Sequence, residues 1–269
     1  MTRPGTAIVT GASTGMGAVY ADRLARRGYD LVLAARNEAR LKALADRLAA
    51  EHAIVVDVIR TDLTARDDLR RIEDRIRADS AVTLLVNNAG MGTPRPVLQE
   101  SIDFLEHDVI GLNVVAAHRL SIAAAQVFAE RRRGGLINIA SIAALHPEKT
   151  NATYAATKAF ILTLSESLHA TLKPLGVRVQ CVLPGATRTE FFDRLGIALD
   201  TRFPADKVMS AEDLVDAALA GYDQGEIVTA PSLPELADWD RYIASRHALD
   251  PNLSHRKPAA RYGLIRADD

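Results

Sequence analysis

The 269-residue sequence predicts an α/β fold, a doubly wound parallel sheet of about seven strands with helices on both faces. Short apolar runs alternate with stretches of helical periodicity up to about residue 230, a pattern typical of repeated strand–helix units. A glycine cluster follows the first apolar run, and prolines interrupt the chain beyond residue 230. We therefore expect a single domain over residues 1–230 and a C-terminal extension over residues 231–269.

The strands and helices are predicted in strict alternation. The strands are the apolar runs at residues 6–10, 31–35, 54–58, 83–86, 136–139, 177–183 and 227–229. The helices begin after the glycine cluster, at residues 38–51, around 69–76, at 104–133 and in the segment that carries Tyr154. Gly111 and Asn113 are poor helix formers inside the longest helix, so we expect a local distortion there.

The turn after the first strand reads G-A-S-T-G-M-G, from Gly11 to Gly17. A strand that ends in glycines and leads into a helix is the setting of a dinucleotide-binding turn. Gly11 would make the tight turn, Gly15 would admit the pyrophosphate, and Gly17 would let the helix pack on its strand. The competing interpretation is an ordinary glycine-rich loop. Three glycines in seven residues directly after the first strand favour the binding turn.

The second predicted strand ends at Ala35 and is followed by Arg36, with no carboxylate at the strand end. A carboxylate there would bind the ribose 2′-hydroxyl of NAD, whereas an arginine suits the 2′-phosphate of NADP. Arg36 therefore predicts that NADP(H) is preferred and that NAD(H) comes second. The alternative is that Arg36 is a solvated loop charge.

Tyr154 and Lys158 lie four residues apart, and Ser141 lies thirteen residues upstream of the tyrosine. Residues four apart share one face of a helix, so the phenol and the ammonium would point into the same space. A nearby positive charge favours the phenolate and would lower the tyrosine pKa from its usual ~10. The Ser141 hydroxyl would hold the oxygen of a substrate. The three residues predict an acid–base site.

Together these segments resemble the short-chain dehydrogenase/reductase family over about residues 5–190. The resemblance rests on the segments Thr10–Gly17, Asp62–Leu63, Asn87–Gly90 and Pro184–Gly185, and on Asn113, Ser141, Tyr154, Lys158 and Thr189. It implies a Rossmann-type fold, a nicotinamide cofactor and hydride transfer between that cofactor and a carbonyl or alcohol.

The resemblance also implies the role of each residue. Tyr154 would be the acid–base group, Ser141 would bind the substrate oxygen, Lys158 would hold the nicotinamide ribose, and Asn113 would order a relay water. The implied cofactor-binding residues, besides Tyr154 and Lys158, are Gly11, Ser13, Thr14, Gly15, Met16, Gly17, Arg36, Asp62, Leu63, Asn88, Ala89, Gly90, Pro184, Gly185 and Thr189.

One position departs from the family pattern. Many NADP-dependent members carry a basic residue just before the second motif glycine, where this chain has Thr14. The 2′-phosphate would then depend mainly on Arg36, with help from Ser13.

The composition of the chain limits which binding partners and cellular compartments are expected. The net charge is −1 and the sequence pI is about 6.7, so no binding to nucleic acid or to an anionic membrane is expected. Cys181 is the single cysteine, lies in a strand-like run and fits a reducing compartment. No metal-ligand spacing, secretory signal or apolar run of ~18 residues is visible, which predicts a cytoplasmic protein without a metal site.

The substrate would lie beyond the carboxyl ends of the strands, against residues 91–99 and 186–207. Phe191, Phe192 and Phe203 lie in the second segment, which we interpret as a substrate lid or a fixed helical insertion. We expect a small, partly apolar carbonyl or alcohol substrate. By resemblance we also expect a homodimer or homotetramer that uses the long helix and the helix of Tyr154. The extension, with its prolines and aromatics, would cover a surface or a neighbouring subunit.

Two other functions remain open at this point. A dinucleotide-binding sensor or scaffold would keep the fold and lose turnover, and the retention of Ser141, Tyr154, Lys158 and Asn113 argues against it. A sugar-nucleotide epimerase or dehydratase also uses Tyr-x-x-x-Lys chemistry. It usually needs a larger substrate domain than the lid and extension provide.

Overall fold

The structure, a computed structural model, describes residues 3–264 and contains the predicted parallel sheet in that range. Seven strands pair in parallel in the order β3-β2-β1-β4-β5-β6-β9. They are β1 Thr6–Thr10, β2 Asp30–Ala35, β3 Val56–Arg60, β4 Val82–Asn87, β5 Gly134–Ile139, β6 Val177–Val182 and β9 Val228–Thr229. The strand order reverses between β1 and β4, and ligands of such sheets bind at the carboxyl ends of the strands beside that reversal.

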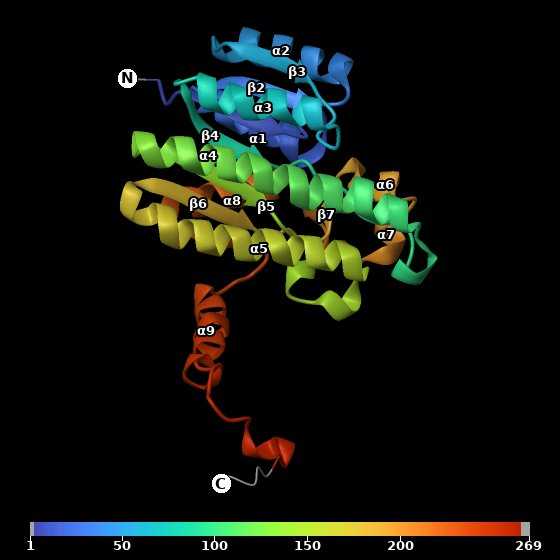
Figure 1. Cartoon of the computed structure of the whole chain (residues 1–269). Helices are drawn as coiled ribbons and strands as arrows, with labels where there is room; N and C mark the ends of the chain where they lie inside the picture. The colour runs from blue at the N-terminus through green and yellow to red at the C-terminus, as the bar shows by residue number, and fades with distance from the viewer. Residues whose placement is uncertain (1–2, 265–269) are drawn as a thin grey trace. The chain divides into compact units, whose positions relative to one another are not determined.

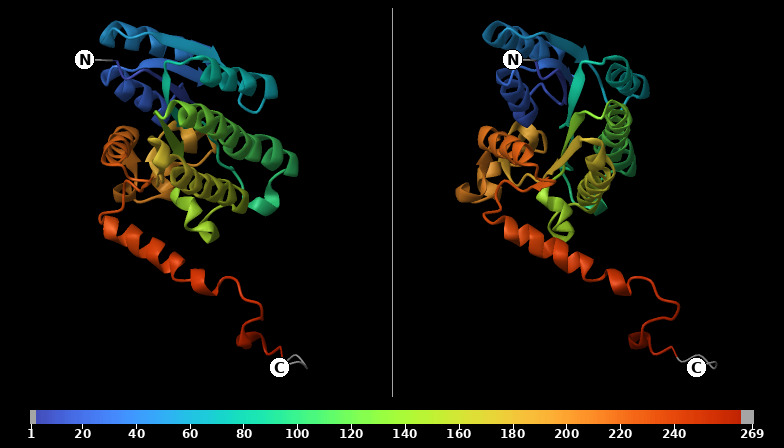
Figure 2. Two further views of the ribbon diagram at one scale, coloured as in Figure 1. Left: turned by 60° about the vertical axis from the view of Figure 1, so that its left-hand side comes forward. Right: turned by 90° about the vertical axis from the view of Figure 1, so that its left-hand side faces the viewer.

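Two layers of helices cover the sheet (Figures 1 and 2). One layer is made of α1 Gly15–Arg26, α2 Glu38–His52 and α8 Ala211–Gln224, and the other of α3 Arg66–Ala78, α4 Ala117–Arg131 and α5 Ala152–Leu172. Each layer buries its own apolar cluster, with Tyr20 and Leu24 in the first and Leu120 and Phe128 in the second. The predicted fold class is confirmed.

Short elements complete the main unit. They are β7 Thr187–Arg188 and β8 Met209–Ser210, which pair in parallel, the helices α6 Glu190–Arg194 and α7 Leu199–Arg202, and 3₁₀ turns at Val97–Gln99, Ile142–Ala144, Pro147–Lys149, Lys173–Leu175 and Ala205–Lys207. Figure 1 shows α6 and α7 beside β7, between β6 and α8 in the chain.

The long helix is distorted where the sequence predicts it. Phe104–Ala116 is π-helical and continues directly into α4. Gly111 and Asn113 lie inside the π-helical part, and the Asn113 side chain is bonded to the backbone of Met91. Wide helical turns of this kind are frequent at functional sites.

The same helix corrects one expectation about membranes. Phe104–Arg131 is a 28-residue helix that contains an 18-residue window with a mean hydropathy of 1.3, so by length and composition it could cross a membrane. It is instead packed on the sheet, with 44% of its apolar window buried. Arg119 Nη2 also donates to Glu73 Oε2 of α3 at 2.8 Å. We therefore interpret it as a core helix of this α/β fold.

Strand β3 begins two residues later than predicted. The apolar run starts at Ile54, yet Val55 is 60% exposed and pairing with β2 begins at Val56. The strand is at the sheet edge, where Asp57 binds Arg75 of α3 at 2.7 Å. An edge strand carries polar residues that an apolar run does not predict.

The chain divides into two units between Pro231 and Ser232, close to the predicted boundary. The second unit contains α9 Leu236–His247 and 3₁₀ turns at Asp250–Asn252 and Ala260–Tyr262. The rings of Trp239 and Tyr242 lie 5.2 Å apart on α9, and no residue of this helix is buried within the chain. The role of the extension stays a prediction.

Candidate active site

The glycine turn is as compact as a dinucleotide requires. Gly11 and Gly15 have φ angles of +67° and +55°, which side-chain-bearing residues rarely adopt. A Cβ on Gly17 would lie 2.3 Å from the carbonyl oxygen of Gly11, so α1 packs on the turn as closely as a glycine allows. The residues therefore fit a phosphate-bearing cofactor, because α1 begins at Gly15 within the turn and its N-terminus favours an anion.

Strand β4 holds this turn in place. Thr10 Oγ1 accepts hydrogen bonds from the N–H groups of Asn88 and Ala89, both at 3.0 Å. The Asn88 amide in turn donates to the carbonyl oxygen of Thr10 at 2.9 Å. Gly90 follows, where a Cβ would lie 3.3 Å from both Asn113 Oδ1 and Lys158 Nζ. The segment thus links the turn to Asn113 and Lys158.

The side chains of the turn face different surroundings. Met16 and Ser13 are both partly buried, and Met16 lines the cleft described below. Thr14 Oγ1 accepts a hydrogen bond from Arg194 of α6 at 3.0 Å. The methyl group of Thr189 would be 3.2 Å from a Cβ on Gly15, so the lid begins directly against the turn.

Arg36 lies exposed after β2, near Asp62. Asp62 Oδ1 accepts from the Thr64 N–H at 3.0 Å and from the Thr64 hydroxyl at 2.7 Å. Burial tends to raise the pKa of Asp62, but these bonds and the charges of Arg36 and Arg60 hold it below its usual value. Leu63 is buried beside it. Asp62 is therefore an ionised acceptor at the edge where an adenine ring is predicted to bind.

Ser141, Tyr154 and Lys158 come together at the carboxyl ends of β5 and β6. Ser141 follows β5, accepts from the Ala143 N–H at 3.1 Å and is hydrogen-bonded to Tyr154. Tyr154 is in the first turn of α5, one turn before Lys158, whose Nζ lies 5.7 Å from the tyrosine ring centre. Lys158 Nζ donates to the Ile139 carbonyl at 3.1 Å. The predicted shared face is present.

The two pKa shifts differ from the expectation. Burial raises the pKa of Tyr154, although the hydrogen bond with Ser141 opposes the rise. Burial also lowers the pKa of Lys158 to about 8. The expected lowering of the tyrosine pKa by Lys158 is therefore wrong for this structure, because removing both groups from water outweighs their proximity.

Asn113 occupies the predicted place beside Lys158 but is heavily hydrogen-bonded. Its Oδ1 accepts from the Met91 N–H at 2.9 Å, and its Nδ2 donates to the Met91 carbonyl and to Thr157 Oγ1 at 2.8 and 3.1 Å. It is 2% exposed. These bonds fasten the loop after β4 to the π-helical segment and to α5. The relay-water role stays a prediction.

The segment after β6 lies beside Ser141 and borders the site across β5 from the segment after β4 that holds the glycine turn. The Pro184 carbonyl accepts from the Ile142 N–H at 3.0 Å and from the Ser141 hydroxyl at 3.4 Å. Gly185 lines the cleft and accepts from Thr187 Oγ1 at 3.1 Å. Thr189 then caps α6 by accepting from the Phe191 N–H at 3.3 Å. The P-G segment thus connects Ser141 to the segment 186–207.

One cleft of about 1380 Å³ is lined by nine of the predicted site residues: Met16, Asn88, Gly90, Ser141, Tyr154, Lys158, Pro184, Gly185 and Thr189. The cleft does not include Arg36, Asp62, Leu63 and Asn113 in its lining. The lid over residues 186–207 lines it with aromatic side chains, and the Phe191 ring centre lies 6.2 Å from that of Tyr154. His146, which the sequence gives little weight, also lines the cleft. Sequence reasoning missed Arg40, Glu190 and Arg194, which join the lid to the cofactor turn. Arg194 and Glu190 are four residues apart on α6, but the contacts of Arg40 with Glu190 and of Arg194 with Thr14 cross 150 and 180 residues of chain, which no local pattern reveals.

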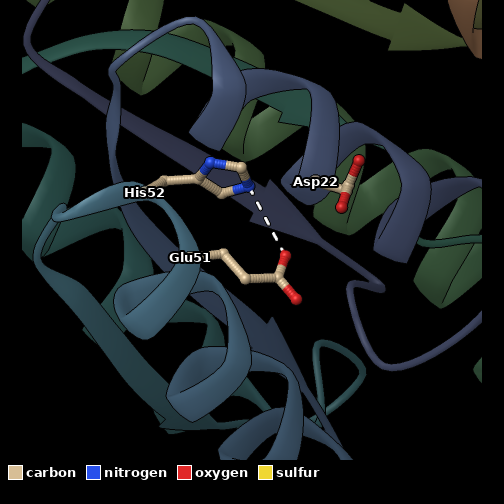
Figure 3. Close-up of side chains that lie close together, drawn as sticks. All are labelled: Asp22, Glu51 and His52. Atoms are coloured by element: carbon tan, nitrogen blue, oxygen red, sulfur yellow. Dashed lines mark ion pairs between the residues drawn. The ribbon is translucent and has the colours of Figure 1, made fainter.

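A second titratable cluster lies away from the cleft. Asp22, Glu51 and His52 bring possible ligand atoms within 4.8 Å of one another (Figure 3). Asp22 is paired with Arg23, Arg26 and Arg47, and Arg47 also binds Glu51 at 2.9 Å. These carboxylates are committed to arginines, so the cluster links α1 to α2. The absence of a metal site stays a prediction.

Comparisons with known proteins agree with this geometry. The short chain dehydrogenase family matches residues 5–198. An uncharacterised oxidoreductase of Myxococcus xanthus is 33% identical over 222 residues, 82% of this chain and 85% of that protein. A very-long-chain 3-oxoacyl-CoA reductase-like protein of Arabidopsis thaliana is 34% identical over 220 residues, 80% of this chain and 69% of that protein.

Two solved structures resemble nearly the whole chain. A short-chain dehydrogenase from Sphingobium yanoikuyae, in complex with NADPH, has a TM-score of 0.92 and 43% identity and covers 96% of this chain and 100% of its own. A bulky-bulky ketone specific alcohol dehydrogenase from Comamonas testosteroni has a TM-score of 0.89 and 41% identity, with 97% and 99% coverage. The chain therefore belongs to the short-chain dehydrogenase/reductase family and is an NAD(P)-dependent oxidoreductase.

Proposed function

We propose that this protein is an NADPH-dependent reductase of bulky, largely apolar ketones, and the corresponding alcohol dehydrogenase in reverse. The observation that carries the proposal is the joint position of Ser141, Tyr154 and Lys158 on the floor of a cleft that Phe191, Phe192 and Phe203 line from the lid. The name of the Comamonas testosteroni relative supports the substrate class.

NADPH rather than NADH is the preferred cofactor in this proposal, with NADH as the second choice. Arg36 stands at the end of β2 where the 2′-phosphate is expected, and the 43% identical Sphingobium yanoikuyae enzyme was solved with NADPH. Gly11, Gly15 and Gly17 would hold the pyrophosphate, and Asp62 and Leu63 would border the adenine.

Tyr154 transfers the proton in this mechanism. The nicotinamide, when bound, supplies the hydride to the carbonyl carbon. Tyr154 gives its phenolic proton to the carbonyl oxygen, and Ser141 donates a hydrogen bond to the same oxygen. The raised pKa keeps Tyr154 protonated at neutral pH. Lys158 is still largely charged there, with a pKa of about 8, and favours the phenolate that the transfer leaves.

Lys158 and Asn113 also organise the site. Lys158 would bind the nicotinamide ribose, and Asn113 would support a relay that returns a proton to the tyrosine. Asn113 holds the loop after β4 and Thr157 of α5 together, so it positions Lys158 on its helix. The aromatic side chains of Phe191, Phe192 and Phe203 would cover the apolar part of a bound ketone beside these groups.

The test is NADPH oxidation over a panel of ketones that differ in the size of both substituents. The proposal predicts kcat/KM values that rise from acetone to ketones with an aromatic or long alkyl group on each side, and lower values with NADH. Tight NADPH binding without oxidation of any ketone would instead favour the sensor or scaffold interpretation. Cofactor recycling without net oxidation would favour an epimerase.

The assembly and location form separate proposals. We propose a homodimer or homotetramer that uses the long helix and α5, where Ile110, Val115 and Phe160 are 37%, 47% and 37% exposed. Light scattering coupled to size-exclusion chromatography measures the mass of the assembly, and the mass of a single chain would contradict this proposal. We also propose a cytoplasmic location, with the substrate and cofactor sites within residues 1–230 and the extension in contact with another surface.

A further inference from the structure

Four side chains form a clasp between the lid, the glycine turn and α2. Arg40 of α2 donates through Nη1 to both carboxylate oxygens of Glu190 at 2.8 and 2.9 Å. Arg194, one turn after Glu190 on α6, donates through Nη2 to Glu190 Oε2 at 3.1 Å and to Thr14 Oγ1 at 3.0 Å. This clasp, made of Thr14, Arg40, Glu190 and Arg194, crosses the edge of the glycine turn.

The place of the clasp is specific. Thr14 is the residue before the second motif glycine, where many NADP-dependent relatives carry a basic side chain. Arg194 brings a guanidinium to that same point from the lid. Arg40 is in the first turn of α2, and its N–H is capped by Asn37, the neighbour of Arg36. Arg40 and Arg194 therefore both bind the Glu190 carboxylate, and Arg194 also contacts the residue before the second motif glycine, next to which the adenosine 2′-phosphate is expected.

We propose that Arg194 supplies the 2′-phosphate with the positive charge that Thr14 does not, and that Glu190 holds Arg194 in place by bridging it to Arg40. The inference rests on the proposed NADPH preference and assigns a specificity-determining residue to it. Two regions would then contribute to the preference for NADPH over NADH: the end of β2, which is followed by Arg36, and the lid, in which Arg194 lies on α6.

The charges of the clasp suit this role. Two guanidiniums share one carboxylate, so the clasp keeps a net charge of +1. Hydrogen bonds from Arg40 and Arg194 lower the pKa of Glu190, so the carboxylate stays ionised around neutral pH. A phosphate with a charge near −2 attracts a guanidinium more strongly than one carboxylate does. Arg194 therefore has a stronger partner in the phosphate than in Glu190.

The lid offers a matched control. Arg188 is also a lid arginine, is 58% exposed against 55% for Arg194, and pairs with Asp200 at 2.9 Å. Its bond joins β7 to α7 and does not reach the glycine turn. Replacing Arg188 removes the same charge from the same segment, so it separates general electrostatics from a specific contact.

The experiment measures dissociation constants of NADPH and NADH by titration of nicotinamide fluorescence for the wild type, Arg194→Ala, Arg188→Ala and Arg36→Ala. Arg194→Ala should weaken NADPH binding about tenfold, as expected for one charge-assisted bond, and leave NADH within about twofold. Arg188→Ala should leave the NADPH/NADH ratio unchanged. Adding Thr14→Arg to Arg194→Ala should restore most of the preference, because the charge returns through the turn.

The outcomes separate the two proposals. Equal affinity of the wild type for NADPH and NADH would overturn the proposed cofactor preference. A wild-type preference that Arg194→Ala leaves intact would overturn this inference alone. Equal losses in Arg194→Ala and Arg188→Ala would also overturn it, because the effect would then follow net charge and not position.

Discussion

The floor of the cleft and its lid bring charged groups together in different ways. On the floor, Lys158 and Asn113 are 6% and 2% exposed, and burial governs the pKa values of both Lys158 and Tyr154. In the lid clasp, the side chains of Arg40, Glu190 and Arg194 are 49%, 43% and 55% exposed. Water screens the clasp, so its ion pairs contribute only about 0–1 kcal/mol each to stability.

This difference in burial suggests different roles for the floor and the lid clasp in the reaction. A buried floor keeps acid–base groups at fixed distances and makes their protonation sensitive to the surroundings. A weak, exposed clasp can break and re-form when substrate and cofactor pass, because little free energy holds it. Changes on the floor should therefore alter the rate of the chemical step, while changes in the lid should alter binding.

Among the substitutions that leave the Tyr154 phenol in place, the largest effect that would break this comparison is expected at Ser141. Replacing it with alanine removes the hydrogen bond to the substrate oxygen, and we expect kcat to fall about 10²- to 10³-fold, as for the loss of an oxyanion donor. NADPH binding should stay near the wild-type value. Thr150→Ala, a change at an exposed residue of the cleft to which the proposed mechanism gives no role, is the control in the same assay.

Gly17 tests how closely α1 packs on the glycine turn beside the floor of the cleft. An alanine Cβ would meet the Gly11 carbonyl oxygen at 2.3 Å and Asn88 Nδ2 at 2.5 Å. We expect Gly17→Ala to lower the free energy of unfolding by about 1–3 kcal/mol through overpacking, measured by urea denaturation. Gly196→Ala has no atom near the new Cβ, but its φ is +67°, so it reports backbone strain alone. Equal losses in the two variants would contradict the packing argument.

The pH dependence of the reductive kcat is expected to follow the protonation of Lys158. Its folded-state pKa is lowered to about 8, so the ammonium is charged below that pH and neutral above it. Tyr154, with a raised pKa, stays protonated over the same range. The reductive kcat should therefore fall about tenfold per pH unit above ~8. A flat profile from pH 6.5 to 9.5 would show that the lysine charge does not matter.

Phe191 gives the smallest effect and belongs to the lid. Its ring faces Tyr154 from above, and Phe191→Ala removes apolar surface from the substrate side of the cleft. We expect KM for a bulky aromatic ketone to rise about fivefold, corresponding to about 1 kcal/mol of lost burial. Acetone, which is too small to reach the ring, serves as the control substrate. A drop in kcat with unchanged KM would contradict this prediction, because it would show that Phe191 acts on the chemical step and not on substrate binding.

The sequence predicts the floor better than the lid. The alternation of strands and helices, the glycine turn and the Tyr-x-x-x-Lys spacing are local patterns, and each lies where it was expected. The distortion around Asn113 also follows from local helix propensity. Contacts between Arg40 and Glu190 join residues 150 positions apart, and local patterns carry no information about them.

Burial explains the main error about the site. The i, i+4 spacing correctly places Lys158 near Tyr154 and predicts that the ammonium lowers the phenol pKa. The structure instead raises that pKa, because the sheet, the lid and α5 remove both groups from water together. Desolvation depends on everything packed around a group, so it emerges only once the fold is complete.

The measurement that tests the central claim most directly is turnover by Tyr154→Phe with NADPH and the best ketone of the panel. This variant removes only the phenolic oxygen and keeps the ring that faces Phe191. We predict an NADPH dissociation constant within about threefold of the wild-type value and a kcat lower by about 10²- to 10⁴-fold. Wild-type turnover by Tyr154→Phe would contradict the claim that Tyr154 delivers the proton.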